Sequence, residues 1–211
     1  MSVQHKSKLF DKAKAEEATK MLLEAIGYRE QTEVDLIGGV ETLGHWGRDD
    51  NLKETPARVA KYWDIVCNGY DEDPKRHLKL FKSKSQEKVA ITNVDLYSFC
   101  SHHLALFRGK ISISYLPHGK VIGISKLLRI SRVFAKRLQL QEDMTNQIAS
   151  FLEAELSPDV AVDVRASHSC MEIRGVRAPG SVTVTTAVRG KFRTEPALRA
   201  EFIQDINEAK K

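Results

Sequence analysis

The sequence is short of cysteine and has no long apolar run, and each shortage excludes a class of protein. Three cysteines in 211 residues are too few, and odd in number, for the disulfide framework of a small secreted domain. No window approaches the ~18 continuous apolar residues of a membrane span. No apolar run follows the first residues, so we see no secretory signal and expect a cytoplasmic protein without a membrane partner.

Charge of one sign is not concentrated anywhere in the chain either. The formal net charge is +5 and aromatic residues make up 7%, but lysines and arginines are scattered and have no aromatic interleaving, so we expect no nucleic-acid partner. A mildly basic surface and a polyanionic small substrate both stay open. With 42% hydrophobic and 29% charged residues, the chain has the composition of a globular domain with room for a helical extension.

Residues 1–85 are predicted to form an N-terminal helical region. Apolar residues at helical spacing predict a first helix over residues 12–26. A stretch rich in glycine and acid follows at 33–51 and is expected to be mostly loop. A second helix opens with Thr55 as its cap, a proline in its first turn, and an end near Gly69.

Residues 86–211 show a different pattern and are predicted to form a second domain. Strand-like runs alternate with helical ones, and a turn at Pro117–Lys120 predicts a hairpin between two strands. This order predicts an α+β fold in which an antiparallel sheet carries its helices on one face. The expected strands are 89–96, 110–116, 121–124, 160–164 and 181–189, and the expected helices begin at 125, 142 and 197.

Two short clusters carry the residue types of a metal site. Cys100 and His103 have the Cys-x-x-His spacing that zinc sites use. His168 and Cys170 lie at i and i+2 on a predicted strand end, where side chains point the same way. One interpretation is a catalytic zinc with the ligands Cys100, His103 and Cys170 and one open position, which leaves His102 and His168 as proton carriers. The other is buried thiols and ordinary surface histidines.

Cations and one acid surround these clusters in the sequence. Ser125 is expected to cap a helix whose first turns carry Lys126 and Arg129, and such a helix start favours anions. Arg174 follows the second cluster. A triphosphate would suit this arrangement, although a solvated basic face explains it as well. Glu142 at a helix start either complements the helix dipole or accepts hydrogen bonds from a guanine edge.

Five motifs in this order resemble the GTP cyclohydrolase I family. The motifs read Glu54–Lys61 (ETPARVAK), Cys100–His103 (CSHH), Val121–Ile130 (VIGISKLLRI), Gln139–Thr145 (QLQEDMT) and His168–Val176 (HSCMEIRGV). The resemblance covers about residues 51–202. The resemblance implies a tunnelling fold, an antiparallel sheet backed by two helices, after an N-terminal helical extension. It also implies a toroidal homo-oligomer, typically a decamer of two pentamers, with active sites between subunits.

The resemblance implies an activity and a role for each matching residue. Zinc would activate water for attack on C8 of GTP, giving formate and 7,8-dihydroneopterin triphosphate, the first step of pterin and tetrahydrofolate synthesis. The zinc ligands would be Cys100, His103 and Cys170, and the catalytic residues His102, His168 and Gln141, the last of which would read the guanine together with Glu142. The triphosphate contacts would be Ser125, Lys126, Arg129 and Arg174, with Arg58 and Lys61 beside them.

Two positions depart from the family pattern, and three other functions stay open. Ser101 stands where the family most often has glutamate, and Leu106 stands near a common proline. Loss of one acid alters the surroundings of the metal but removes no ligand. The alternatives are a non-catalytic paralogue that binds GTP or zinc, a related tunnelling-fold enzyme with another purine or pterin substrate, and a small structural-zinc interaction module.

Overall fold

The structure, a computed structural model, describes residues 9–26, 36–37, 40–41 and 50–209. The chain divides into two compact units, Met1–Asp71 and Glu72–Lys211, and each is described by itself. The predicted division into an N-terminal helical region (residues 1–85) and a catalytic domain (residues 86–211) stays a prediction.

The first unit is built on two helices that contact each other, α1 (Lys12–Ala25) and α3 (Thr55–Val66). The Asp11 carboxylate accepts a hydrogen bond from the Lys14 backbone N–H (3.1 Å) and so caps α1. The helix predicted over residues 12–26 is therefore confirmed to within one residue. The prediction that Thr55 caps α3 is wrong, because Glu54 occupies the cap position and Thr55 is already helical.

Most of the stretch expected to be loop, residues 33–51, lies outside the described residues. Its described parts are a short antiparallel pair, β1 (Leu36–Ile37) with β2 (Val40–Glu41), and the start of α2 (Asp50–Lys53). Two 3-10 turns, Asn68–Tyr70 and Pro74–His77, follow α3.

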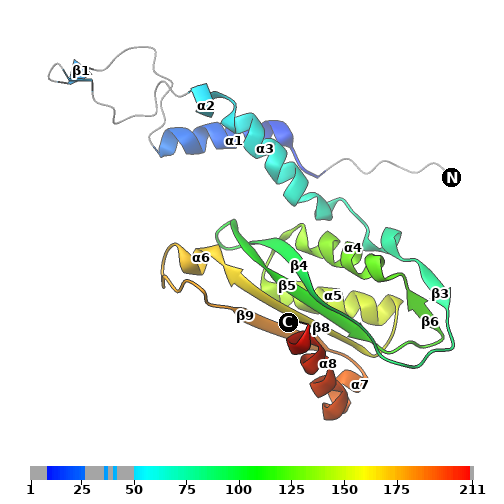
Figure 1. The fold of residues 1–211 in the computed structure, drawn as a ribbon. Coiled ribbons are helices and arrows are strands. Elements are labelled where there is room, and N and C mark those ends of the chain that lie inside the picture. The colour runs from blue at the N-terminus through cyan, green and yellow to red at the C-terminus, as the bar shows by residue number, and fades with distance from the viewer. Residues whose placement is uncertain (1–8, 27–35, 38–39, 42–49, 210–211) are drawn as a thin grey trace, which may run out of the picture. The chain divides into compact units, whose positions relative to one another are not determined.

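The second unit is organised around a five-stranded sheet with the order β7-β4-β5-β8-β9 (Figure 1). Its long strands pair antiparallel, as predicted, whereas the short edge strand β7 runs parallel to β4. Alternating apolar residues on the central strands place one side of each strand in the core. The strands are β4 (Val89–Cys100), β5 (Ala105–Tyr115), β7 (Leu138–Gln139), β8 (Val160–His168) and β9 (Thr183–Val188).

Two helices, α4 (Ile124–Ala135) and α5 (Gln141–Glu155), cover one face of this sheet (Figure 1). On α5, Met144, Ile148 and Leu152 are fully buried at a spacing of four and form one stripe. They share the main core with alternate residues of β8. Burying each such side chain stabilises the fold by about 1.5–3 kcal/mol, so the stripe holds the N-terminus of α5 in place at the sheet.

The opposite face of the sheet is covered in part by α7 (Lys191–Thr194) and α8 (Pro196–Glu208). Phe202 and Ile206 of α8 form a second cluster with Ala161, which points away from its neighbours on β8. The prediction that all helices lie on one face is therefore wrong for the last helix. Its apolar residues needed a partner, and the alternate side of β8 provides one.

The predicted hairpin through Pro117–Lys120 is also wrong. The strand that follows the turn, β6 (Lys120–Ile122), pairs antiparallel with β3 (Leu80–Lys82) in a separate two-stranded ladder and not with β5. The β5 edge is already taken by β4 and β8, so no position beside it was free. In the described part of the chain, no helix is long and apolar enough to cross a membrane.

Four segments that are distant in sequence meet at one end of the sheet. The residues of β4 and β5 next to their connecting turn pair with each other, and Cys100 at the end of β4 pairs with Gln139 of β7. Phe107 of β5 pairs with His168, the last residue of β8. The start of α5 follows β7 after one residue. This end of the sheet carries the predicted site.

Candidate metal centre

Three potential metal ligands converge at this end of the sheet. Cys100 is the last residue of β4, His103 lies in the turn between β4 and β5, and Cys170 lies in the one-turn helix α6 (Ser169–Glu172). Their ligand atoms all lie within 4.8 Å of one another. The turn is tight enough that Leu104 adopts a positive φ of 52°, which turns the chain back and brings His103 toward Cys100.

The donor set fits zinc. Thiolate and imidazole are ligands that zinc prefers. Donors held ~2.0–2.3 Å from one ion are separated by no more than about 4.6 Å, so small side-chain movements suffice to close the group around a metal. The prediction that Cys100, His103 and Cys170 come together from distant segments is confirmed as a group able to hold a metal ion; the identity of that metal belongs to the proposal below.

The backbone around Cys170 differs from what the sequence pattern predicted. We expected His168 and Cys170 to lie at i and i+2 on one strand. The strand β8 ends at His168, and Cys170 is helical. The turn of helix brings the Cys170 thiol back toward Cys100, whereas a continuing strand would carry it away along the sheet.

The surroundings of the Cys170 thiol disfavour its deprotonation. Burial raises the pKa of the Cys170 thiol, and the neighbouring Cys100 adds to this effect, while a backbone N–H and the Arg174 charge oppose it. A metal must therefore displace a proton from the Cys170 sulfur when it binds. Because the thiol pKa is raised, metal affinity is expected to fall as the pH is lowered.

A cavity of about 470 Å³ opens beside the three ligands. It contains both predicted proton carriers and both residues predicted to read the base. Its walls also include residues to which the sequence analysis assigned no role, among them Met171 and Thr183. The full lining is Cys100, His102, His103, Gln139, Leu140, Gln141, Glu142, His168, Cys170, Met171 and Thr183.

His168 is held on two sides in this cavity. Its ring stacks on Phe107, with centroids 4.6 Å apart and an interplanar angle of 12°, and its Nε2 lies 2.8 Å from Gln141 Oε1. Burial lowers the pKa of the imidazole, and the nearby Glu142 carboxylate opposes that shift. The ring is thus mainly neutral near pH 7 and able to accept a proton. The Phe107 contact depends on the β5–β8 register and could not be read from local sequence.

The residues predicted to contact phosphate are divided among three places. Arg174 lies at the metal group, where its Nη1 is 2.6 Å from His103 Nε2. Ser125, Lys126 and Arg129 lie on α4, and in the described structure none of them lines this cavity. The predicted cap is wrong, because α4 begins at Ile124 with Gly123 in the cap position and no capping side chain.

The remaining two predicted contacts, Arg58 and Lys61, lie on α3 in the first unit. Both are exposed. The Arg58 guanidinium is paired with the Glu54 carboxylate at 2.6 Å, an exposed pair one helical turn apart that contributes little to stability.

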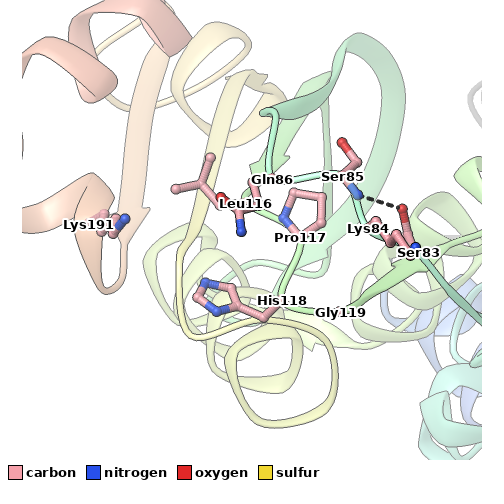
Figure 2. A pocket seen from close by; sticks show the side chains of 9 residues that line it. All are labelled: Ser83, Lys84, Ser85, Gln86, Leu116, Pro117, His118, Gly119 and Lys191. Carbon is pink, nitrogen blue, oxygen red and sulfur yellow. Dashed lines mark hydrogen bonds between the residues drawn. The ribbon is translucent and has the colours of Figure 1, made fainter.

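A second cavity, of about 600 Å³, lies elsewhere in the second unit (Figure 2). Residues of three segments line it, Ser83–Gln86, Leu116–Gly119 and Lys191. Its lining includes no cysteine, and its imidazole, His118, lies 2.7 Å from the buried carboxylate of Asp159. Size alone would favour this cavity as the functional site, but the groups that can bind a metal line the smaller cavity.

Comparison with known proteins identifies the family. The family model of GTP cyclohydrolase I matches residues 30–207. The chain belongs to the GTP cyclohydrolase I family. This confirms the resemblance inferred from the five motifs, and the match includes both metal-ligand clusters.

Curated relatives are similar to this chain over most of its length. GTP cyclohydrolase 1 of Pelotomaculum thermopropionicum is 45% identical over 196 residues, which are 92% of this chain and 95% of the relative. GTP cyclohydrolase 1 of Carboxydothermus hydrogenoformans is 44% identical over 196 residues, covering 92% and 93%. A shorter match, at 47% over 160 residues, is to GTP cyclohydrolase 1 of Wolinella succinogenes and covers 74% and 86%.

Proposed function

We propose that this protein hydrolyses GTP to formate and 7,8-dihydroneopterin triphosphate. The single observation that carries the proposal is the convergence of Cys100, His103 and Cys170 beside His168 and Glu142 in one cavity, in a chain of the GTP cyclohydrolase I family. The reaction opens the imidazole ring of the purine at C8, and the product would feed pterin and tetrahydrofolate synthesis.

The metal we propose is zinc, held by Cys100, His103 and Cys170. Among the described residues these three form the group that can hold a metal, and a three-ligand set that leaves a position for water is typical of catalytic zinc. When bound, zinc supplies a Lewis acid that lowers the pKa of water and makes it a nucleophile near neutral pH.

The chain's own residues would bind the base and move protons. Glu142 is exposed at the start of α5 and lines the cavity, and its carboxylate can accept hydrogen bonds from the N1–H and 2-amino groups of guanine. His168, neutral and held in place, would first take up a proton in the cavity and then give it to the imidazole nitrogen of the substrate as the ring opens. His102, which also lines the cavity, would carry a second proton.

Triphosphate binding would require more than one copy of the chain. Arg174 lies at the metal group, but Ser125, Lys126 and Arg129 do not line the same cavity. We propose that α4 of a neighbouring subunit supplies them, within a tunnelling-fold homo-oligomer of toroidal shape, a decamer of two pentamers. Arg58 and Lys61 would add to this pocket. The phosphates do not react, so these contacts orient the substrate. We place the enzyme in the cytoplasm.

The proposal is tested by incubating the zinc-loaded protein with GTP. One formate per GTP and the fluorescence of an oxidised pterin are expected, both abolished by a chelator and restored by added zinc. GTP left intact by fully zinc-loaded protein would contradict the proposal and favour a non-catalytic paralogue. A second nucleotide turned over faster than GTP would favour a related enzyme with another substrate.

A further inference from the structure

Gln141 is buried at the first position of α5, with only 1% of its surface exposed. Its amide nitrogen lies near three oxygens of the sheet: the backbone carbonyls of Val164 (3.0 Å) and Thr183 (3.1 Å) and the hydroxyl of Thr185 (3.1 Å). A backbone carbonyl accepts hydrogen bonds and never donates them. The amide NH₂ must therefore face these carbonyls, because a flipped amide would set its oxygen against two others.

This orientation fixes where the proton of His168 lies. The Gln141 oxygen faces His168 Nε2 at 2.8 Å, and an amide oxygen accepts only. Nε2 must therefore be the nitrogen that donates. In the neutral ring Nδ1 then has no hydrogen, and it is the position at which His168 takes up or gives away a proton. The stacking of the ring on Phe107 opposes the ring flip that would exchange the two nitrogens.

Two threonines, Thr145 and Thr185, form hydrogen bonds with Gln141, and the donor in each of these bonds can also be assigned. The Thr145 hydroxyl donates to the Gln141 backbone carbonyl at 2.7 Å. Its hydrogen is thus used, and at the 2.7 Å contact between Thr145 and Thr185 the Thr185 hydroxyl must be the donor. Thr185 then has lone pairs free for the Gln141 NH₂. Every hydrogen bond from Thr185 through Gln141 to His168 therefore has a fixed donor and a fixed acceptor. The network has one arrangement and does not switch between two.

We propose that Gln141 is a positioning residue that holds His168 in its Nε2–H tautomer, so that the proton exchanged with the substrate is carried at Nδ1. The inference rests on the proposed function, since it names the working nitrogen of a residue in that site. It also separates Gln141 from Glu142, with which it was paired as a reader of guanine. The Gln141 NH₂ is occupied by the sheet, so the base would be read by Glu142.

The direct test is ¹⁵N NMR of histidine-labelled, zinc-loaded protein without substrate, at a pH where the ring is neutral. The His168 signals are assigned by their loss in the His168→Gln variant. We expect a protonated Nε2 and an unprotonated Nδ1. A His168 ring protonated at Nδ1 would overturn the proposal. This readout needs no turnover, so it can fail while formate release succeeds, and the reverse also holds.

Substitutions at Gln141 give the kinetic test. Gln141→Leu removes the acceptor, and we expect His168 to show both tautomers and kcat to fall about tenfold to a hundredfold, the size of effect known for residues that orient a catalytic group, with KM for GTP changed less than about twofold. Gln141→Glu, as a neutral acid, can accept from Nε2–H and donate to one carbonyl, so it should restore the single tautomer and most of kcat.

A matched control is Gln204→Leu, an exposed glutamine on α8 that contacts Glu208. It should match the unaltered protein in tautomer and in both kinetic constants. If Gln141→Leu instead raises KM strongly while kcat and the His168 signals stay unchanged, Gln141 reads the purine and the positioning role is wrong. If Gln141→Leu does not fold, the NMR result on the unaltered protein still decides.

Discussion

Two histidines in the second unit make nearly the same hydrogen bond in different surroundings. His168 Nε2 lies 2.8 Å from Gln141, and His118 Nε2 lies 2.7 Å from Asp159. Both partners are buried, with 1% and 4% of their surface exposed. The partner of His168 is a neutral amide, whereas the partner of His118 is a carboxylate.

The surroundings decide what each pair can do. The second oxygen of Asp159 accepts a hydrogen bond from the Lys191 backbone N–H at 2.7 Å, so the His118 pair ties the segment after β5 to the start of α7. His168 lies in a cavity with two thiols and an acid. A short bond to an imidazole therefore does not by itself mark a catalytic group. The residues that line the same cavity do, because His168 shares its cavity with Cys100, Cys170 and Glu142.

The largest expected difference between the cavity of His168 and the cavity of His118 is the effect on activity of losing a metal ligand. Cys170→Ser removes a thiolate, so the protein should lose its zinc and at least about ten-thousandfold of its turnover of GTP, because the activated water is lost with the metal. Metal analysis and formate release measure both. Cys67 is remote in sequence from both metal-ligand clusters, so the Cys67→Ser protein should keep its zinc and its turnover of GTP. Turnover by a metal-free Cys170→Ser protein would contradict the metal role.

Next in size is the contrast between the two histidines themselves. His168→Ala should lower kcat about a thousandfold, within the range of general acid–base catalysis, and retain zinc. His118→Ala should keep kcat within about twofold, since its cavity holds none of the reacting groups. Steady-state kinetics with metal analysis makes the comparison. Equal losses in the two variants would show that the cavities were assigned wrongly.

A smaller effect separates two adjacent acids in the first turn of α5. Glu142→Gln leaves a guanine edge facing an amide that offers both a donor and an acceptor, so kcat/KM for GTP should fall about a hundredfold. Asp143→Asn changes the same charge in the same turn, but Asp143 does not line the cavity, and its kinetics should be close to those of the unaltered protein. Parallel losses would point to the helix dipole and not to base recognition.

The smallest effects are on stability in the region of His118. His118→Ala leaves a buried carboxylate oxygen without its partner and should lower the free energy of unfolding by about 1–3 kcal/mol. Gly190→Ala should cost more, because the added Cβ would lie 2.1 Å from Asp159 Oδ1 and Gly190 has a φ of 52°. Denaturant unfolding measures both. An unchanged midpoint for His118→Ala would mean that the pair holds nothing together.

Local sequence predicted the elements better than their partners. The strands of residues 89–116 and the helix α5 show clear periodicity, because burial on one side dictates it. The pairing of β6 with β3 and the placement of α8 on the far face depend on which surfaces are still free after the central strands have paired. Such competition involves the whole fold and leaves no local pattern.

The same division holds for the site. Cys100, His103 and Cys170 were predicted from residue type and from the family motifs, since few other side chains bind zinc. The contacts that hold His168 could not be predicted, because Phe107 depends on the strand register and Thr183 and Thr185 lie on a strand some forty residues after Gln141. Threonine and phenylalanine are common in strands, so neither residue type signals a role.

X-ray absorption at the zinc edge of the zinc-loaded protein is the most direct test of a metal site with an open position. The expected first shell is two sulfurs at ~2.3 Å, one nitrogen at ~2.0 Å and one light atom from water. A shell filled by four protein ligands, or one with fewer than two sulfurs, would contradict the claim that this end of the sheet holds a metal with an open position.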